Sequence, residues 1–323
     1  MIRSYVFSEG KLIGEGVDTD ALKLVRADKG LHIWVDLDQP TPQESKLILE
    51  EVFNFHPLAI EDCLAVSHLP KIEDYDDYLF LVMHAVDFSR KDKFVTSEVD
   101  FFLGKEFLVT HHTVPIRSLQ SVIDRLQKNS HQIARMPDRL LHTLLDSLVD
   151  NYQPVISELT YEIQELEDQL FSEDKRDQKN CMSEFLSIKK DVLNLRQIVR
   201  PQREVINRIV HNEFKIIRST LTPYYRDVYD HLYRIEESTA NHNDQLMLSM
   251  DVFLNKASNE TNQVIKALTM VTVYTTPATL IASWYGMNFV HMPELQTHYG
   301  YLYAVLLTFI TTVILYFWFR KKL

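Results

Sequence analysis

The chain has 323 residues, of which 46% are hydrophobic and 24% charged, and its formal net charge is -11. A hydrophobic fraction of this size supports a folded core and argues against a disordered chain. The negative charge argues against a nucleic-acid-binding protein, which needs a basic face to displace counterions, and is compatible with a protein that handles cations.

The N-terminal residues and the cysteines indicate a cytosolic location for most of the chain. Residues 1–12 lack the long apolar core and the small-residue cleavage site of a signal peptide. Cys63 and Cys181 do not have the spacing of a structural zinc site, so we expect reduced thiols in a reducing compartment.

Residues 1–135 predict a mixed α/β cytosolic domain. Thr41-Pro42-Gln43-Glu44 is typical of a helix start, with Thr41 as the cap and Glu44 returning the hydrogen bond. His111 and His112 are adjacent, so on a strand they would point to opposite faces and would not share a metal. Runs rich in Val, Phe, Leu and Tyr predict strands over 32–37, 78–86, 98–103 and 107–110.

Helical patterns dominate from residue 136 onward. Residues 136–222 predict cytosolic helical arms, one of them over 178–211 with Pro201 expected to kink or end it. Residues 223–266 predict a stalk helix that continues into the segment after it. An unbroken helix of about 60 residues would reach on the order of 90 Å, too long for a globular core.

Two apolar segments near the C-terminal end predict a membrane hairpin. They span 267–285 and 299–319, each about 20 residues, the length that crosses about 30 Å of hydrocarbon. The polar link 286–298 holds Glu294, the one Asp, Glu, Lys or Arg between 267 and 319. Lysines precede the first segment and the tail 320–323 is basic, so the positive-inside rule places both termini in the cytosol. The alternative is a buried hairpin of a soluble protein.

One face of the stalk and the first apolar segment carries a polar seam. Its positions alternate in steps of four and three, the period of a heptad, and all but one are polar. A polar face in hydrocarbon should contact other helices or water. Hydroxyls alone have a simpler explanation, because Thr and Ser often bond back to the helix carbonyls. The continuity of the seam below the membrane instead favours a water-filled pore. The seam consists of Asp251, Asn255, Ser258, Asn262, Ile265, Thr269, Thr272, Thr276, Thr279 and Ser283.

Motifs along the whole chain resemble those of the CorA family of magnesium transporters. Gly286-Met287-Asn288 resembles the Gly-Met-Asn signature of that family at the end of the first span, and Met292-Pro293-Glu294-Leu295 resembles the loop that follows it. Residues 225–231 (YRDVYDH) resemble a stalk segment, and Trp34-Val35-Asp36-Leu37 resembles part of the N-terminal domain.

The resemblance implies an α+β membrane protein that is not an enzyme: a homopentameric channel in the plasma (inner) membrane, in contact with lipid. Its cargo would be Mg²⁺, with Co²⁺ or Ni²⁺ as further ions, and it would need no organic cofactor and no nucleotide. Asn288 would form the outer ring that meets the hydrated ion, presented by Gly286 and Met287. By resemblance, the rings that line the pore are Ser283, Thr279, Thr276, Thr272, Leu268, Ile265, Asn262 and Asp251. They agree with the seam except that Leu268 takes the place of Thr269.

The resemblance also implies a regulatory ion between subunits. The acidic partners would be Asp227 on the stalk and an acid of the N-terminal domain, Asp87. Acidic subunits repel one another, and a divalent ion between carboxylates would offset that repulsion. We expect Mg²⁺ bound there to close the pore.

Two other hypotheses remain open at this point. One is a zinc-moving relative that shares the Gly-Met-Asn turn. The other is a membrane-anchored helical scaffold that conducts nothing, for which an apolar or irregular seam is expected.

Overall fold

The computed structural model describes residues 1–26, 28, 30–65, 69–87, 95–172, 178–288, 292–293 and 297–322. These residues form two compact units, Met1–Ser249 and Met250–Leu323.

The first unit is built on a seven-stranded sheet in the order β2-β1-β3-β7-β6-β5-β4. Neighbouring strands are antiparallel except β3 and β7, which run parallel. The strands are β1 (Ile2–Ser8), β2 (Lys11–Glu15), β3 (Leu31–Asp38), β4 (Lys71–Asp74), β5 (Tyr78–Asp87), β6 (Val95–Gly104) and β7 (Phe107–His112). The four strands expected from sequence lie in β3, β5, β6 and β7, and that prediction is confirmed.

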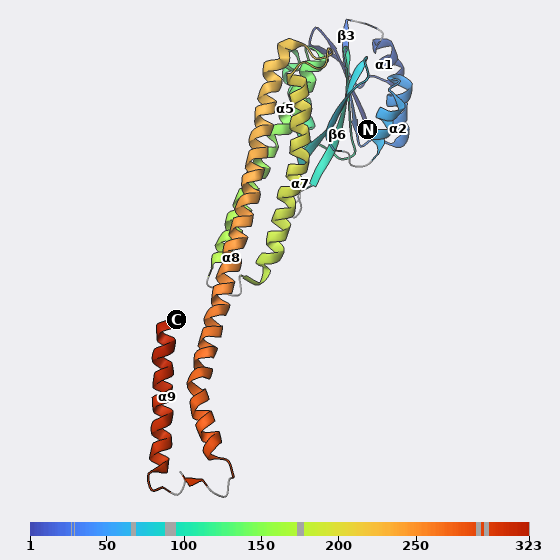
Figure 1. Ribbon diagram of the computed structural model, residues 1–323. Coiled ribbons are helices and arrows are strands. Elements are labelled where there is room, and N and C mark those ends of the chain that lie inside the picture. Colours follow the sequence, from blue (N-terminus) through green and yellow to red (C-terminus); the bar gives the residue numbers. More distant parts are fainter. Residues whose placement is uncertain are drawn as a thin grey trace. The chain divides into compact units, whose positions relative to one another are not determined.

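Helices cover both faces of the sheet (Figure 1). On one face lie α1 (Thr19–Arg26), α2 (Pro42–Lys46), the π-helix η1 (Leu47–Val52) and α3 (Pro57–Leu64). Their apolar side chains pack on alternate strand residues such as Val35, Phe102 and Val109. Thr41 caps α2 in a complete capping box with Glu44, as its sequence predicts.

On the other face lie α4 (Arg117–Ile133) and α5 (Pro137–Asp150), with α7 (Gln178–Val210) against β4 and β5. The helix α6 (Tyr152–Phe171) pairs with α7, and the 3₁₀ turn η2 (Ser219–Leu221) precedes α8 (Thr222–Tyr285). The helix α7 continues past Pro201, so the expectation that this residue could end it is not met.

A buried polar network joins the sheet to these helices. The hydroxyl of Tyr152 donates to the carbonyl of His84 at 2.7 Å, and the amide of Gln202 donates to the hydroxyl of Tyr152 at 2.7 Å. The N–H of His84 in turn donates to the side-chain oxygen of Gln202 at 3.3 Å. These three hydrogen bonds fix the helices on the sheet.

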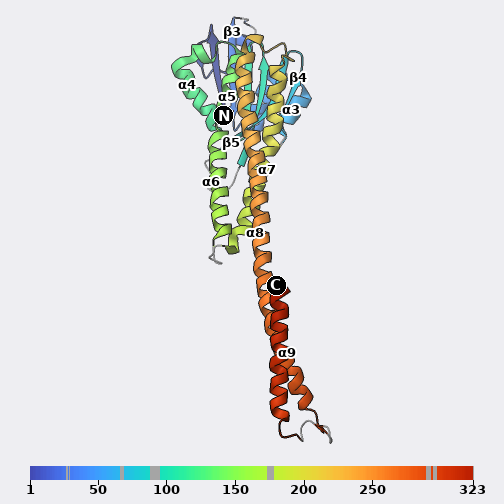
Figure 2. The same cartoon turned by 60° about the vertical axis from the view of Figure 1, so that its left-hand side comes forward.

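The second unit consists of the C-terminal part of α8 and of α9 (Gly300–Lys322). In both views α9 lies beside that part of α8 (Figures 1 and 2), and the rings of Tyr274 and Tyr316 meet at 6.0 Å between centroids. Both helices are long and apolar enough to cross a membrane, with mean hydropathies of 1.4 and 2.1 over their most apolar stretches. Only 6% and 0% of these stretches is buried within the chain, which argues against the alternative of a soluble core hairpin.

Candidate ion pathway

The polar seam lies on a face of α8 that α9 leaves uncovered. All ten seam residues are exposed in the chain, including Ile265 at 54%. Pro277 is buried, and partly buried residues mark the covered side of the same helix: Met270, Val273, Tyr274, Ile281 and Tyr285. The two sets are separated around the helix by its 3.6-residue period. The seam is therefore free to meet water or another copy of the chain.

The seam threonines use their hydroxyl protons within the helix. The hydroxyls of Thr269, Thr272, Thr276 and Thr279 donate to the carbonyls four residues earlier, at oxygen–oxygen distances of 2.7–3.0 Å. This is the back-bonding that the simpler explanation expects. It leaves the lone pairs of each hydroxyl oxygen pointing outward, so the seam presents hydrogen-bond acceptors. Waters bound to a cation offer their hydrogens outward, which matches such a surface.

The exposed fraction does not decide between Leu268 and Thr269 as the fifth pore ring. Leu268 is 67% exposed and Thr269 is exposed as well. The lower pore candidates Asn262 and Asp251 are also exposed on α8. The structure thus presents every candidate pore residue at the helix surface.

The Gly-Met-Asn turn follows directly after α8. The N–H of Gly286 donates to the carbonyl of Ala282 at 3.0 Å, and the N–H of Met287 to the carbonyl of Trp284 at 3.4 Å. A Cβ on Gly286 would lie 3.1 Å from the carbonyl oxygen of Ala282, so a larger residue would crowd the end of the helix. Asn288 is exposed beyond this turn. Glu294 lies outside the described residues.

Asp227 lies in an acidic cluster on the first unit. Its side chain is 67% exposed, and its Oδ1 lies 3.9 Å from Nε2 of His231, one turn later on α8. Nδ1 of His231 lies 3.5 Å from Oδ1 of Asp150 on α5. Burial, and next the charge of Asp150, raise the pKa of Asp146 above its ordinary value. The charge of Asp227 contributes in the same direction, so the carboxylates are close enough to repel one another.

The sequence reasoning named Asp227 but missed Asp146, Asp150 and His231. The spacing of Asp146 from Asp150, one helical turn apart, was a signal that could have found the α5 pair. Its approach to α8 depends on tertiary packing. Asp87 ends β5, where its backbone pairs with Val95, and its side chain lies outside the described residues. The pairing of Asp227 with Asp87 between subunits stays a prediction.

Comparison with known proteins decides the family. A family model described as CorA-like Mg²⁺ transporter protein matches residues 30–321. The chain belongs to this family. It is therefore a member of a transporter family and not an enzyme.

Individual members of the CorA-like family match nearly the whole chain. The Bacillus subtilis protein YfjQ is 33% identical over 289 residues, 90% of this chain and 88% of that protein. The cobalt/magnesium transport protein CorA of Thermotoga maritima is 32% identical over 297 residues, 91% of this chain and 84% of that protein. The complete structure of the CorA magnesium transporter from Methanocaldococcus jannaschii superposes with a TM-score of 0.79 at 20% identity, covering 99% of this chain and 98% of that one. The fold class expected from sequence is confirmed.

Proposed function

We propose that the chain is one subunit of a homopentameric Mg²⁺ channel in the plasma (inner) membrane, with both termini in the cytosol. The observation that carries the proposal is the exposed acceptor face of α8, which α9 leaves uncovered. In hydrocarbon such a face is costly, and a closed ring of copies removes the cost by turning it toward a shared water-filled axis. The number five rests on the resemblance to the CorA family.

The acceptor rings suit a hydrated divalent ion. Mg²⁺ gives up its waters reluctantly, so neutral oxygens that accept from its water shell guide it without trapping it. Asn288 would contact the shell at the outer mouth, and Leu268 and Ile265 would form an apolar constriction that can dewet. An inside-negative potential favours entry of a double charge by about 4.6 kcal/mol per 100 mV, so no nucleotide is needed. The name of the Thermotoga maritima relative adds cobalt as a second cargo.

Reconstitution tests this function. The full-length protein is placed in liposomes that contain a Mg²⁺-sensitive dye, under an imposed inside-negative potential. We expect Mg²⁺ entry well above that of protein-free vesicles, rising with the potential, and five copies per particle by single-particle mass measurement. Dye signals equal to those of empty vesicles would contradict the channel and favour the non-conducting scaffold. Entry of Zn²⁺ in preference to Mg²⁺ would favour the zinc-moving relative.

We further propose that cytosolic Mg²⁺ closes the pore by binding at Asp227. The observation in this chain that supports a cation there is the grouping of Asp227 and Asp150 around His231, at 3.9 and 3.5 Å from its ring nitrogens. Asp87 of a neighbouring copy remains the proposed second partner. A bound divalent ion would offset the repulsion and hold adjacent subunits together.

The matched experiment compares Asp227→Asn with Asp244→Asn, which removes one charge from the same helix outside the cluster. Flux is recorded in liposomes loaded with increasing internal Mg²⁺. We expect the Asp227 variant to resist block and the Asp244 variant to behave as wild type. Equal block in all three proteins would refute regulation at Asp227 while leaving the channel itself standing.

A further inference from the structure

A second group of potential metal ligands lies inside the α/β domain and includes no residue of α8. Cys63 comes from α3, Asp100 from β6 and His111 from β7. Asp100 and His111 are directly opposed in the antiparallel β6–β7 pair, so their side chains share the face of the sheet that α3 covers. Their ligand atoms and the Cys63 Sγ all lie within 4.8 Å of one another.

The three residues are buried, and one carboxylate oxygen among them lacks a hydrogen-bond partner. The side chains of His111 and Asp100 are only 4% and 3% exposed, and Cys63 is 3% exposed. Nδ1 of His111 lies 3.3 Å from Oδ2 of Asp100, a long contact for a hydrogen bond. Oδ1 of Asp100 has no hydrogen-bond partner among the described residues. The Cys63 thiol also hydrogen-bonds to Asp100, but a buried carboxylate with one unpartnered oxygen is costly unless a cation completes it.

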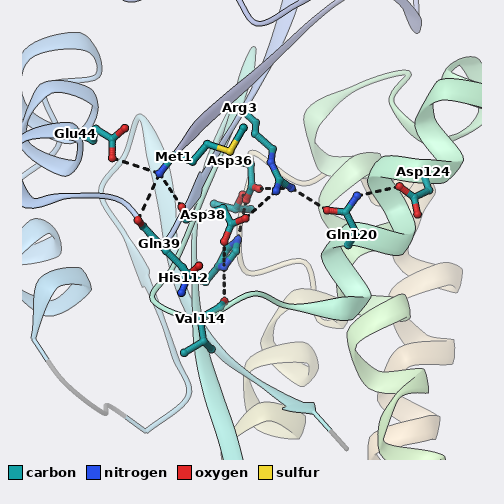
Figure 3. A network of polar contacts seen from close by, with 11 residues as sticks. Met1, Arg3, Asp36, Asp38, Gln39, Glu44, His112, Val114, Gln120 and Asp124 are labelled. Carbon is teal, nitrogen blue, oxygen red and sulfur yellow. Dashed lines mark hydrogen bonds and ion pairs between the residues drawn. The ribbon is translucent and has the colours of Figure 1, made fainter. Parts of the chain in front are cut away.

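The other histidine of the adjacent pair lies in a network that includes a permanent positive charge. His112 points to the opposite face, as the sequence predicted, and contacts Asp36, Asp38 and the carbonyl of Val114 (Figure 3). Arg3 donates to Asp38 at 2.8 Å and adds a permanent positive charge to that network. Among the described residues, Asp100 forms no ion pair with a Lys or an Arg.

We propose that Cys63, Asp100 and His111 form a buried site for Zn²⁺ or a chemically similar transition-metal ion. A thiolate, an imidazole and a carboxylate are a zinc-type donor set, whereas Mg²⁺ takes oxygen ligands. Metal–ligand bonds of about 2.0–2.3 Å place neighbouring ligand atoms roughly 3.3–3.8 Å apart in a tetrahedral site. The group therefore needs to close by only about 1 Å, and the Cys63 thiol proton leaves as the metal binds.

The ion would fasten α3 to two central strands of the sheet. Because all three ligands are buried, the ion should exchange slowly and hold these elements together, with a water molecule in the fourth coordination position. This site shares no residue with the acceptor face of α8 or with the Asp227 cluster, and its donor atoms are of a different chemical kind. It does not depend on the proposed channel activity.

Metal content of the full-length protein tests the proposal. The protein is produced with added zinc, purified in detergent and dialysed against EDTA to strip exposed ions, and zinc is measured by plasma mass spectrometry. We expect close to one zinc per wild-type chain, one per Cys181→Ser chain and almost none in Cys63→Ser. Cys181 is the matched control because it is also buried but belongs to α7. Wild-type protein without zinc would overturn the proposal, and this readout needs no variant to fold.

Cobalt supplies a second readout that identifies the ligands. Protein produced with Co²⁺ in place of zinc should show a thiolate-to-cobalt charge-transfer band that persists in Cys181→Ser and disappears in Cys63→Ser. In His111→Gln the thiolate band should be weaker than in wild type or absent. Circular dichroism checks that each variant is folded. A band that follows Cys181, or a folded Cys63→Ser chain with wild-type zinc content, would refute the assignment. Neither result would bear on ion flux.

Discussion

Arg218 and Thr279 show how differently the two units use polar side chains. In the first unit Arg218 makes two 2.7 Å hydrogen bonds to the carboxylate of Asp138, whose side chain is 5% exposed. The hydroxyl of Tyr225 donates to the carbonyl of Asp138 at 2.9 Å, which ties α8 to α5. In the second unit Thr279 donates to its own helix and turns its remaining lone pairs outward from an exposed position.

The contrast separates polar residues that hold the fold from those available for function. Buried polar groups must find partners, and the α/β domain largely supplies them. Among the described residues, no seam side chain has such a partner on α9, although the seam continues along an apolar helix. Substitutions in the first unit should therefore change stability first, and substitutions in the seam should change flux first.

The largest expected effect is on stability. Arg218→Ala removes the bidentate partner of a buried carboxylate and should cost about 2–3 kcal/mol of unfolding free energy, since only part of the pair is buried. Glu213→Ala, which breaks an exposed pair with Arg208, should cost less than about 1 kcal/mol. Denaturant unfolding followed by circular dichroism measures both. Similar losses for the two variants would contradict the assigned difference in burial.

Asn288 should give the largest effect on flux. Replacing it by Leu keeps a side chain of similar size but removes the amide that would contact the hydrated ion, and we expect flux to fall by about tenfold or more. The thermal unfolding midpoint should stay near that of wild type because Asn288 is exposed. Liposome flux and a thermal melt on the same preparation check both parts. A large drop in the melting midpoint would assign Asn288 to the fold instead.

A smaller effect is expected within the seam. Thr279→Val keeps the shape of the side chain and removes one acceptor from each subunit, so we expect a few-fold loss of flux. Thr311→Val is the matched control on α9, since the Thr311 hydroxyl also donates to a carbonyl four residues earlier, at 2.8 Å. Flux through the control should equal that of wild type. Equal losses in both would show that back-bonding, and not pore lining, explains the hydroxyls.

The smallest expected effect is a pH dependence in the first unit. Burial alone would lower the pKa of His112, but its hydrogen bond to Asp36 and the charges of Asp36 and Asp38 raise it above 6.5. A raised pKa stabilises the fold fully below pH 6.5 and less as the pH rises through the folded value. The wild-type melting midpoint should therefore fall over that window, and the profile of His112→Gln should be flatter. Parallel pH profiles of the two proteins would contradict this role. Arg3, which pairs with Asp36, is the other charged group of this network.

Local patterns made much of this fold predictable from sequence. The Thr41 capping box needs only four consecutive residues, and the apolar runs of β3, β5, β6 and β7 indicate buried strands. By contrast, β2 alternates exposed and half-buried residues, and β4 is short and charged, so neither has a strong strand signal. Pro201 lies in a helix that packs on α6 and the sheet, and this packing offsets the missing hydrogen bond.

The candidate sites also differ in how far the sequence alone predicts them. The seam was readable because all its members lie on one helix with a fixed period. The grouping of Asp227 with Asp146 and Asp150, and of Cys63 with Asp100 and His111, joins residues from separate elements. No spacing in the sequence encodes such groupings, because β6–β7 register and helix packing create them.

Water access to the seam is the most direct test of the account. Single cysteines are introduced by Thr272→Cys, Thr276→Cys and Thr279→Cys on the seam, and by Val273→Cys and Ile281→Cys on the face toward α9. Wild type is the blank because Cys63 and Cys181 are both buried. We expect a charged, membrane-impermeant thiol reagent to label the seam positions and block flux through them, while the α9-facing positions stay unlabelled. Equal labelling of cysteines on both faces, or seam cysteines that never react, would contradict a water-filled path along α8.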